Sequence, residues 1–188
     1  MKVSVGVSNR HVHLKREHLD ILFGENYELE VKKELTQPGQ FAACEVVMLK
    51  TDKGVLENVR VLGPLRDYTQ VEISKTDAYK LGINPPVRNS GDLSGSESIT
   101  LIGPKGEVKI NEGCIIATRH IHLSEEHIKE YKLEGKDKVS IKVNGEKGGI
   151  LENVYLKVLP NSYLELHLDT DDANAHLIEN GDIVEVIL

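Results

Sequence analysis

The sequence predicts a mainly β protein built from two related halves, of the barrel or sandwich type and with few helices. Short runs of β-branched residues are separated by Gly, Asn, Asp and Pro along the whole chain. Many short strands at this spacing indicate barrels or sandwiches rather than a doubly wound sheet. Blocks of similar sequence also recur in the same order, which indicates that one half is a copy of the other.

The internal repeat is the most informative feature. SNRHVHLKREHL at residues 8–19 matches ATRHIHLSEEHI at 117–128, an offset of 109. GVLENV at 54–59 matches GILENV at 149–154, an offset of 95, and a third block, VEIS against LHLD, follows at that same offset. Three collinear matches indicate duplication, with the first half 14 residues longer between its first two blocks.

The order of elements follows from local patterns. The β-rich runs predict strands over residues 3–7, 45–49, 55–62, 70–74, 98–102, 107–110, 139–143, 150–159, 163–168 and 182–187. A helix is expected after His13, with an apolar face and a stop at Gly24, and another after Ser124, a good N-cap. Residues 84–98 are rich in Pro, Gly and Ser and are expected to connect the halves.

Composition limits the class of protein. At 188 residues the chain is long enough to bury a core without disulfides. Its net charge of −7 argues against sequence-independent nucleic-acid binding, and no apolar run is long enough for a membrane helix. Cys44 and Cys114 stand far apart without a neighbouring base, so we expect both to be small buried residues in a reducing cytoplasm. No secretory signal is expected at the start of the sequence.

Each half carries an HxH pair at the end of an expected strand. Side chains at positions i and i+2 share one face of a strand, so each pair can direct two imidazoles at one ion. The repeat supplies a third donor on the polar face of a later strand, a glutamate in the first half and a histidine in the second. Each set suits zinc or a similar metal and leaves a position open, and two such half-sites predict a two-metal centre. The sets are His11, His13 and Glu72, and His120, His122 and His167.

A cupin metal site is the alternative interpretation of the first HxH pair. HVHLKRE followed by Gly24 fits the cupin spacing HxHxxxE-x6-G, with Glu17 as the third ligand. Residues 14–23, however, have helical periodicity, and the second copy has Leu133 where the glycine belongs. We therefore prefer Glu17 as a residue of a first helical turn.

Arginine is the expected anchor for an anionic substrate. Arg66 follows a Gly-Pro corner just before the strand that carries Glu72. Its guanidinium offers a bidentate fork that matches phosphate. Arg10 and Arg119, each beside an HxH pair, are alternatives.

Taken together, SNRHVHL, GPLR..TQVEIS, TRHIHLS and LHLDTDDANA make the chain resemble the PduL-type phosphotransacylases, the phosphate propanoyltransferase and phosphate acetyltransferase family. The resemblance runs from residue 5 to about 187. It implies transfer of a propanoyl or acetyl group from coenzyme A to phosphate, a reaction catalysed by an acyltransferase. It also implies two β-barrel domains capped by short helices, with the first strand exchanged. The implied domains are residues 10–105, and 1–9 together with 106–188.

The resemblance assigns roles to particular residues. It implies two zinc ions per chain, held by the six metal donors named above. It implies that Arg66 binds phosphate and acts in catalysis, with Ser90 beside it as a further phosphate contact. Coenzyme A, the substrate or product, would contact Val7, Ser8, Asn9, Lys53, Arg60 and Asn174.

Partners and location are expectations of the same kind. A homodimer is the commonest assembly and is expected here, with no nucleic-acid or membrane partner. Family members that enter bacterial microcompartments carry an amphipathic extension, whereas only Met1 and Lys2 precede the first strand here. A cytoplasmic enzyme is therefore expected rather than an encapsulated one. A dinuclear zinc hydrolase and a cupin-like metal-binding module remain the alternative functions.

Overall fold

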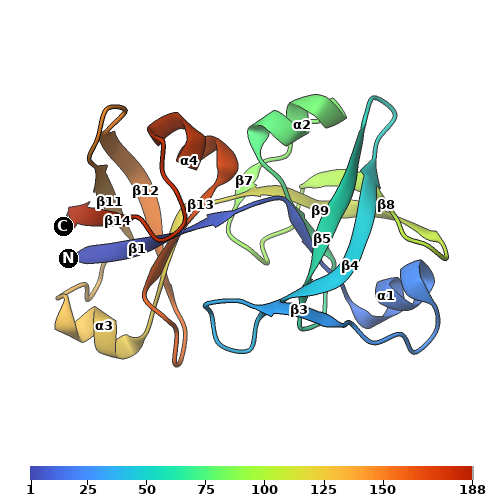
Figure 1. Cartoon of the computed structure of the whole chain (residues 1–188), viewed down its shortest axis with the longest axis horizontal. Helices are drawn as coiled ribbons and strands as arrows, with labels where there is room; N and C mark the ends of the chain where they lie inside the picture. The colour runs from blue at the N-terminus through green and yellow to red at the C-terminus, as the bar shows by residue number, and fades with distance from the viewer. Residues whose placement is uncertain (188) are drawn as a thin grey trace. The chain divides into compact units, whose positions relative to one another are not determined.

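The computed structural model describes residues 1–187 and divides into two compact units (Figure 1). Unit 1 comprises Met1–Asn9 and Thr118–Leu188, and unit 2 comprises Arg10–Ala117. The described part of the chain contains no helix that is long and apolar enough to cross a membrane. Both units are built mainly from β-strands, which confirms the predicted fold class.

Unit 2 contains a ring of six strands in which each strand pairs with the next and the last returns to the first. In ring order these are β4 (Phe41–Lys50), β5 (Val55–Gly63), β2 (His11–His13), β6 (Gln70–Glu72), β9 (Glu107–Ala117) and β8 (Glu97–Ile102). Two further strands extend the ring at its rim, β3 (Val31–Glu34) on β4 and β7 (Val87–Arg88) on β9. The helices of this unit are α1 (Arg16–Phe23) and α2 (Lys75–Leu81).

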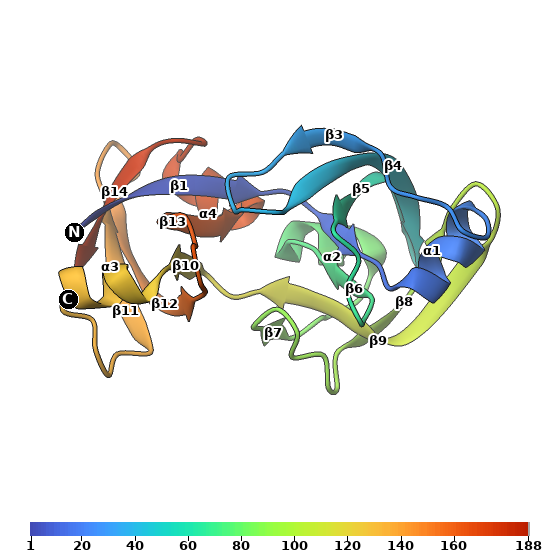
Figure 2. The ribbon, with the colours of Figure 1, turned by 90° about the horizontal axis from the view of Figure 1, so that it is seen from below.

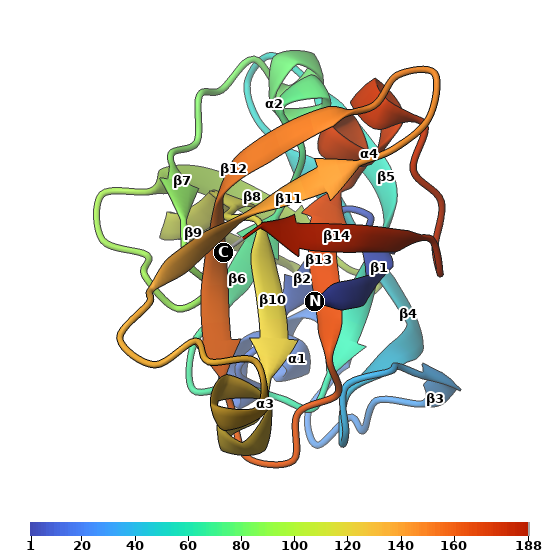
Figure 3. The same cartoon turned by 90° about the vertical axis from the view of Figure 1, so that its left-hand side faces the viewer.

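Unit 1 is also a closed barrel of six strands, and Figure 3 shows them around its wall. In order they are β1 (Lys2–Ser8), β13 (Glu165–Asp169), β10 (His120–Leu123), β12 (Gly149–Val158), β11 (Lys138–Val143) and β14 (Ile183–Ile187). Figure 2 shows β1 running beside β14 and β13, which are its two partners. The helices of this unit are α3 (Glu125–Glu130) and α4 (Thr170–His176).

The two barrels share one topology, strand for strand. In unit 1, β1 is parallel to β13 and antiparallel to β14. In unit 2, β9 is parallel to β6 and antiparallel to β8, so it holds the place of β1. Each strand that leads into an HxH strand therefore closes the barrel of the other repeat. The exchange is reciprocal.

This exchange moves the domain boundary from the expected residue 105 to residue 117. Residues 106–117 were expected with the second half, but β9 pairs with β6 and β8. Its Val108, Ile110 and Cys114 lie in the core of unit 2. Alternation along a strand shows which side chains point inward, but not which barrel the strand closes.

The third donors lie where period-2 alternation predicts them. Val71 and Ile73 are buried in the core of unit 2, and Leu166 and Leu168 in the core of unit 1. Glu72 and His167, which stand between these residues, therefore take the opposite face of their strands.

Polar caps fix the helices that follow these strands. Ser74 accepts a hydrogen bond from the Asp77 amide at the start of α2, and Asp169 accepts one from Asp172 at the start of α4. Ser124 caps α3 as predicted. The sequence did not indicate α2 or β3. The additional residues of the first half lie between α1 and β5, in the segment that contains β3 and the longer strand β4.

Two further expectations were wrong. Residues 84–98 do not connect the halves, because they lie within unit 2, after α2, and include β7 and the start of β8. Cys44 is exposed rather than buried, whereas Cys114 is buried as expected. Cys44 lies on β4 but its side chain faces away from the core, while Ala43 beside it is fully buried.

Candidate metal centres and anion site

In unit 2 the first donor set gathers on neighbouring strands. His11 and His13 lie on β2, and Glu72 on β6 lies directly opposite His11 in the antiparallel ladder. The two imidazole centroids are 5.1 Å apart, and His11 Nε2 is 3.4 Å from Glu72 Oε2. One donor atom from each residue lies within 4.8 Å of the others. The register of two short strands thus brings together residues about 60 positions apart in the sequence.

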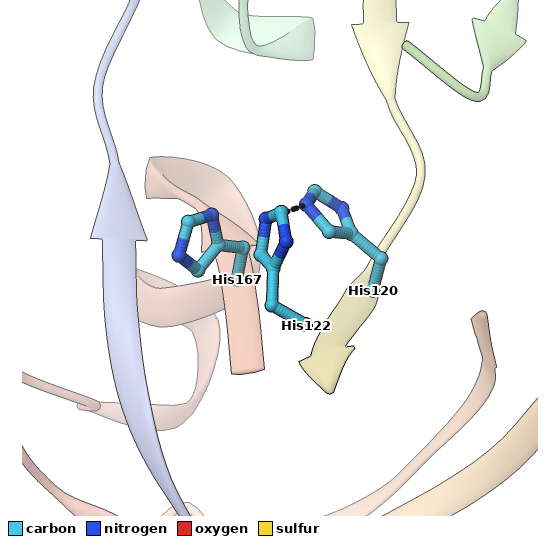
Figure 4. Close-up of side chains that lie close together, drawn as sticks. All are labelled: His120, His122 and His167. Atoms are coloured by element: carbon cyan, nitrogen blue, oxygen red, sulfur yellow. Dashed lines mark hydrogen bonds between the residues drawn. The ribbon is translucent and has the colours of Figure 1, made fainter. Parts of the chain in front are cut away.

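Unit 1 repeats this arrangement with three histidines, shown in Figure 4. His120 and His122 lie on β10, and His167 on β13 lies opposite His120. His120 Nε2 is 3.2 Å from His122 Nε2, and the rings of His122 and His167 are 4.5 Å apart. The donor atoms again lie within 4.8 Å of one another. The equivalence of Glu72 and His167, inferred from the offset of 95, holds in the strand register.

The protonation of these imidazoles suits a cation. Burial, reinforced by neighbouring His11 and Arg66, lowers the pKa of His13 well below its usual value, so the ring is neutral near pH 7. His120 Nδ1 lies 2.8 Å from the Thr118 carbonyl oxygen, which makes Nδ1 the protonated nitrogen and leaves the Nε2 lone pair directed at His122. Neutral rings oriented by a backbone carbonyl are typical of metal ligands.

A hydrogen-bonded chain connects Arg66 to the donor set of unit 2. Arg66 Nη1 donates to Ser90 Oγ at 3.1 Å, and Gln70 Nε2 lies 2.9 Å from the same hydroxyl. Gln70 Nε2 also donates to Glu72 Oε1 at 2.5 Å. The structure therefore brings Arg66 and Ser90, both expected to contact phosphate, into direct contact. Two further hydrogen bonds lead from Ser90 through Gln70 to Glu72, a candidate metal ligand.

Arg66 keeps donors for an anion. Besides Ser90, its guanidinium donates to the Tyr68 hydroxyl at 3.2 Å, and it forms no ion pair with any carboxylate among residues 1–187. The Gly91 amide, on the same loop as Ser90, donates to Gln70 Oε1 at 2.7 Å. This bond holds the loop against β6 and keeps Ser90 beside Arg66.

Arg10 and Arg119 serve a different purpose. Arg10 Nε donates to Asp77 Oδ2 on α2 at 2.8 Å, and Arg10 Nη2 forms an ion pair with Asp77 Oδ1 at 2.7 Å. Arg119 makes the equivalent contact with Asp172 on α4, at 2.7 Å for both bonds, and the Asp172 hydrogen bond raises the pKa of Arg119. Each arginine directly precedes an HxH strand, so its contact with the aspartate anchors a helix to the start of that strand. Arg66 is the better anion candidate.

The residues expected to contact coenzyme A are spread over both units. In unit 1, Val7 and Ser8 end β1, with Ser8 opposite Asp169, and Asn174 is exposed on α4. In unit 2, Arg60 lies opposite His11 in β5 and donates to the Cys44 carbonyl oxygen at 2.8 Å. The remaining two, Asn9 and Lys53, are exposed, and Lys53 packs against Gly82 at the end of α2.

The cupin ligand set does not form. Glu17 lies in the first turn of α1 with its side chain 75% exposed, and it pairs with Lys15 at 2.5 Å. His18 Nδ1 instead contacts Thr69 Oγ1 at 2.8 Å, and His127 completes the capping box of α3. These side chains thus have other partners, and only His127 among them caps a helix.

Two residues of the site were missed in the sequence. Gln70 links Ser90 to Glu72, and Glu165 lies 2.8 Å from His167 Nε2. Each stands two positions before the third donor of its set and shares a repeat position with the other. The combination of the offset of 95 with the period of a strand would have identified both.

Comparison with known proteins identifies the family. The model of the phosphate propanoyltransferase family matches residues 4–179. A phosphate propanoyltransferase of Thermotoga maritima is 52% identical over 186 residues, which cover 98% of this chain and 89% of the relative. Proteins of the same name from Rhodopseudomonas palustris and Priestia megaterium are 48% and 51% identical, over 98% and 96% of this chain and 82% and 83% of theirs.

Proposed function

Because the chain belongs to the phosphate propanoyltransferase family, and is thus an acyltransferase, we propose that it transfers a short acyl group between coenzyme A and phosphate. The proposed reaction is acyl-CoA + phosphate ⇌ acyl phosphate + CoA, with propanoyl or acetyl as the acyl group. We further propose one zinc ion at each donor set, two per chain. The assembly proposed is a homodimer.

The chain of contacts from Arg66 through Ser90 and Gln70 to Glu72 is the observation that carries this proposal. It couples an anion-binding guanidinium to a set of metal donors by way of two side chains. Zinc bound to these donors would supply a Lewis acid for the thioester carbonyl and a ligand for the thiolate sulfur.

Arg66 orients phosphate for attack in this proposal. A guanidinium with free N–H groups binds two phosphate oxygens side by side, and the Ser90 and Tyr68 hydroxyls restrict its rotation. A phosphate oxygen forms the new bond to the carbonyl carbon, and the carbon–sulfur bond breaks with its electron pair on sulfur. Phosphate is already an anion, so the reaction requires no strong general base.

In this proposal the chain supplies orientation and charge stabilisation, and the buried thiol of Cys114 takes no covalent part. Cys114 is buried, and burial raises its thiol pKa to about 12, so it supplies no thiolate nucleophile near pH 7. The proposed contacts to coenzyme A are Val7, Ser8, Asn9, Lys53, Arg60 and Asn174.

A metallohydrolase is the second candidate, because two sets of histidine and carboxylate donors also suit the activation of water. Release of thiol from propanoyl-CoA and acetyl-CoA, measured with and without phosphate, separates the two. We expect release to require phosphate and to yield an acyl phosphate that hydroxylamine traps. Equal release without phosphate would refute the transferase and support the hydrolase.

A further inference from the structure

The two donor sets differ at the third ligand and also at the residue two positions before it. In unit 1 this pair is Glu165 and His167, and in unit 2 it is Gln70 and Glu72. The pairs occupy the same place in the ladder, since Glu165 lies opposite His122 and Gln70 opposite His13. Both members of the pair therefore changed between the two copies.

The two changes are complementary in hydrogen bonding. His167 Nε2 lies 2.8 Å from Glu165 Oε2, and an ionised carboxylate only accepts, so the imidazole donates. In unit 2 the direction is reversed, because the Gln70 amide donates to the Glu72 carboxylate at 2.5 Å. The histidine ligand has an acceptor beside it, and the carboxylate ligand has a donor.

The bond to Glu165 determines which nitrogen of His167 is left for a cation. With Nε2 donating to Glu165, the lone pair is on Nδ1. Figure 4 shows one ring nitrogen of His167 on the side of His122 and the other on the far side. The pair thus presents an unprotonated nitrogen to the other two imidazoles.

Strand β1 leaves room for this pair. Gly6 lies directly opposite His167, and a Cβ atom at Gly6 would come within 3.1 Å of Glu165 Cδ and 3.2 Å of His167 Cδ2. Glu165 is only 9% exposed. A buried carboxylate is costly unless it is hydrogen-bonded, so its presence here indicates a specific role.

We propose that Glu165 is a positioning residue that fixes the tautomer and the ring orientation of His167, and that Gln70 does the reciprocal task for Glu72. This inference rests on the proposed metal sites. It predicts that each partner is specific for its own ligand: an acceptor for the imidazole and a donor for the carboxylate.

The first test removes the acceptor. Glu165→Met keeps the length of the side chain but leaves the His167 N–H without an acceptor, whereas Glu165→Gln keeps one acceptor oxygen. In zinc titrations of the metal-free protein against a chromophoric chelator, we expect Glu165→Met to weaken one of two sites by roughly 10- to 100-fold. Glu165→Gln should weaken it less. Glu185→Met, an exposed substitution on β14 of the same barrel, is the matched control and should leave both sites unchanged.

The second test exchanges the pair. His167→Glu alone places two carboxylates side by side and should bind zinc weakly in unit 1, whereas Glu165→Gln with His167→Glu rebuilds the pair of unit 2. We expect the double variant to bind zinc in unit 1 more tightly than His167→Glu alone in the same chelator titration. A purely structural role for Glu165 predicts no such rescue.

The outcomes distinguish the positioning role of Glu165 from the proposed metal site of unit 1. Two wild-type zinc sites, both unaffected by Glu165→Met, would overturn the positioning role alone, as would a double variant no better than His167→Glu. Wild-type protein that binds no zinc in unit 1 would overturn the proposed metal site and this inference together.

Discussion

Replacement of Arg66 tests the proposed phosphate site most directly. Its Nη1 is held by Ser90 at 3.1 Å and Tyr68 at 3.2 Å, and no carboxylate among residues 1–187 forms an ion pair with it. A phosphate held by the remaining N–H groups in the transition state contributes roughly 2–4 kcal/mol. Arg66→Ala should therefore lower kcat/KM for phosphate by roughly 30- to 900-fold. Arg66→Lys keeps the charge but loses the fork, so its loss should be intermediate.

Initial-rate kinetics with phosphate varied at saturating propanoyl-CoA provide the measurement. The KM for propanoyl-CoA and the zinc content should change little, because Arg66 is not among the metal donors. Arg88→Ala is the control, since Arg88 is a partly exposed residue of the same unit that pairs with Asp92 at 3.6 Å. Exposed pairs contribute about 0–1 kcal/mol, so the control should lose less than about 5-fold. Phosphate kinetics like wild type in Arg66→Ala would refute the assignment.

Three further predictions concern metal content, pH and backbone conformation. Metal analysis should give about two zinc ions per chain in wild type and in Glu17→Gln but about one in Glu72→Gln, and the reverse pattern would favour the cupin set. The thiol pKa of buried Cys114 is raised from 9.0 to about 12, so between these pH values only the unfolded chain ionises it. Wild-type stability should then fall up to ~1.4 kcal/mol per pH unit more steeply than that of Cys114→Ala in urea titrations, and equal slopes would contradict this. Leu177 ends α4 with a positive φ of 55° and is 61% exposed, whereas a glycine, Gly82, ends the equivalent helix α2. Leu177→Gly should therefore raise the free energy of unfolding by about 1 kcal/mol. A lower free energy of unfolding would show that the contacts of the Leu177 side chain outweigh the backbone strain.

The donor sets could be predicted because their information is local and repeated. An HxH pair in a strand fixes the direction of two side chains, and the offset of 95 aligned Glu72 with His167 without any knowledge of the pairing. The structure adds the register, which places each third donor opposite the first histidine of its set. Two short patterns were therefore enough to select six residues from the chain.

The candidate anion site could be predicted only in part, because it depends on a loop. Arg66 was identified from its place before the Glu72 strand, but nothing in the sequence joined it to residues 84–98, which were expected to link the halves. The loop is held against β6 by the hydrogen bond from the Gly91 amide to Gln70 and lies within unit 2. Long-range contacts of irregular segments leave no periodic signal, so Ser90 was proposed from resemblance alone.

The duplication explains why residues 1–187 carry two similar donor sets, whereas the candidate anion site described above has no counterpart at the equivalent positions of the second copy. Both barrels keep the same strand order, the same helix-anchoring arginine and aspartate, and a third donor at the same register. At the offset of 95, however, Asn161 stands where Arg66 stands in the first copy. The connection from α2 to β8, which carries Ser90, is also longer than the connection from α4 to β14. The strands and their candidate metal ligands are thus the shared scaffold, whereas Arg66 and the loop that carries Ser90 belong to the first copy.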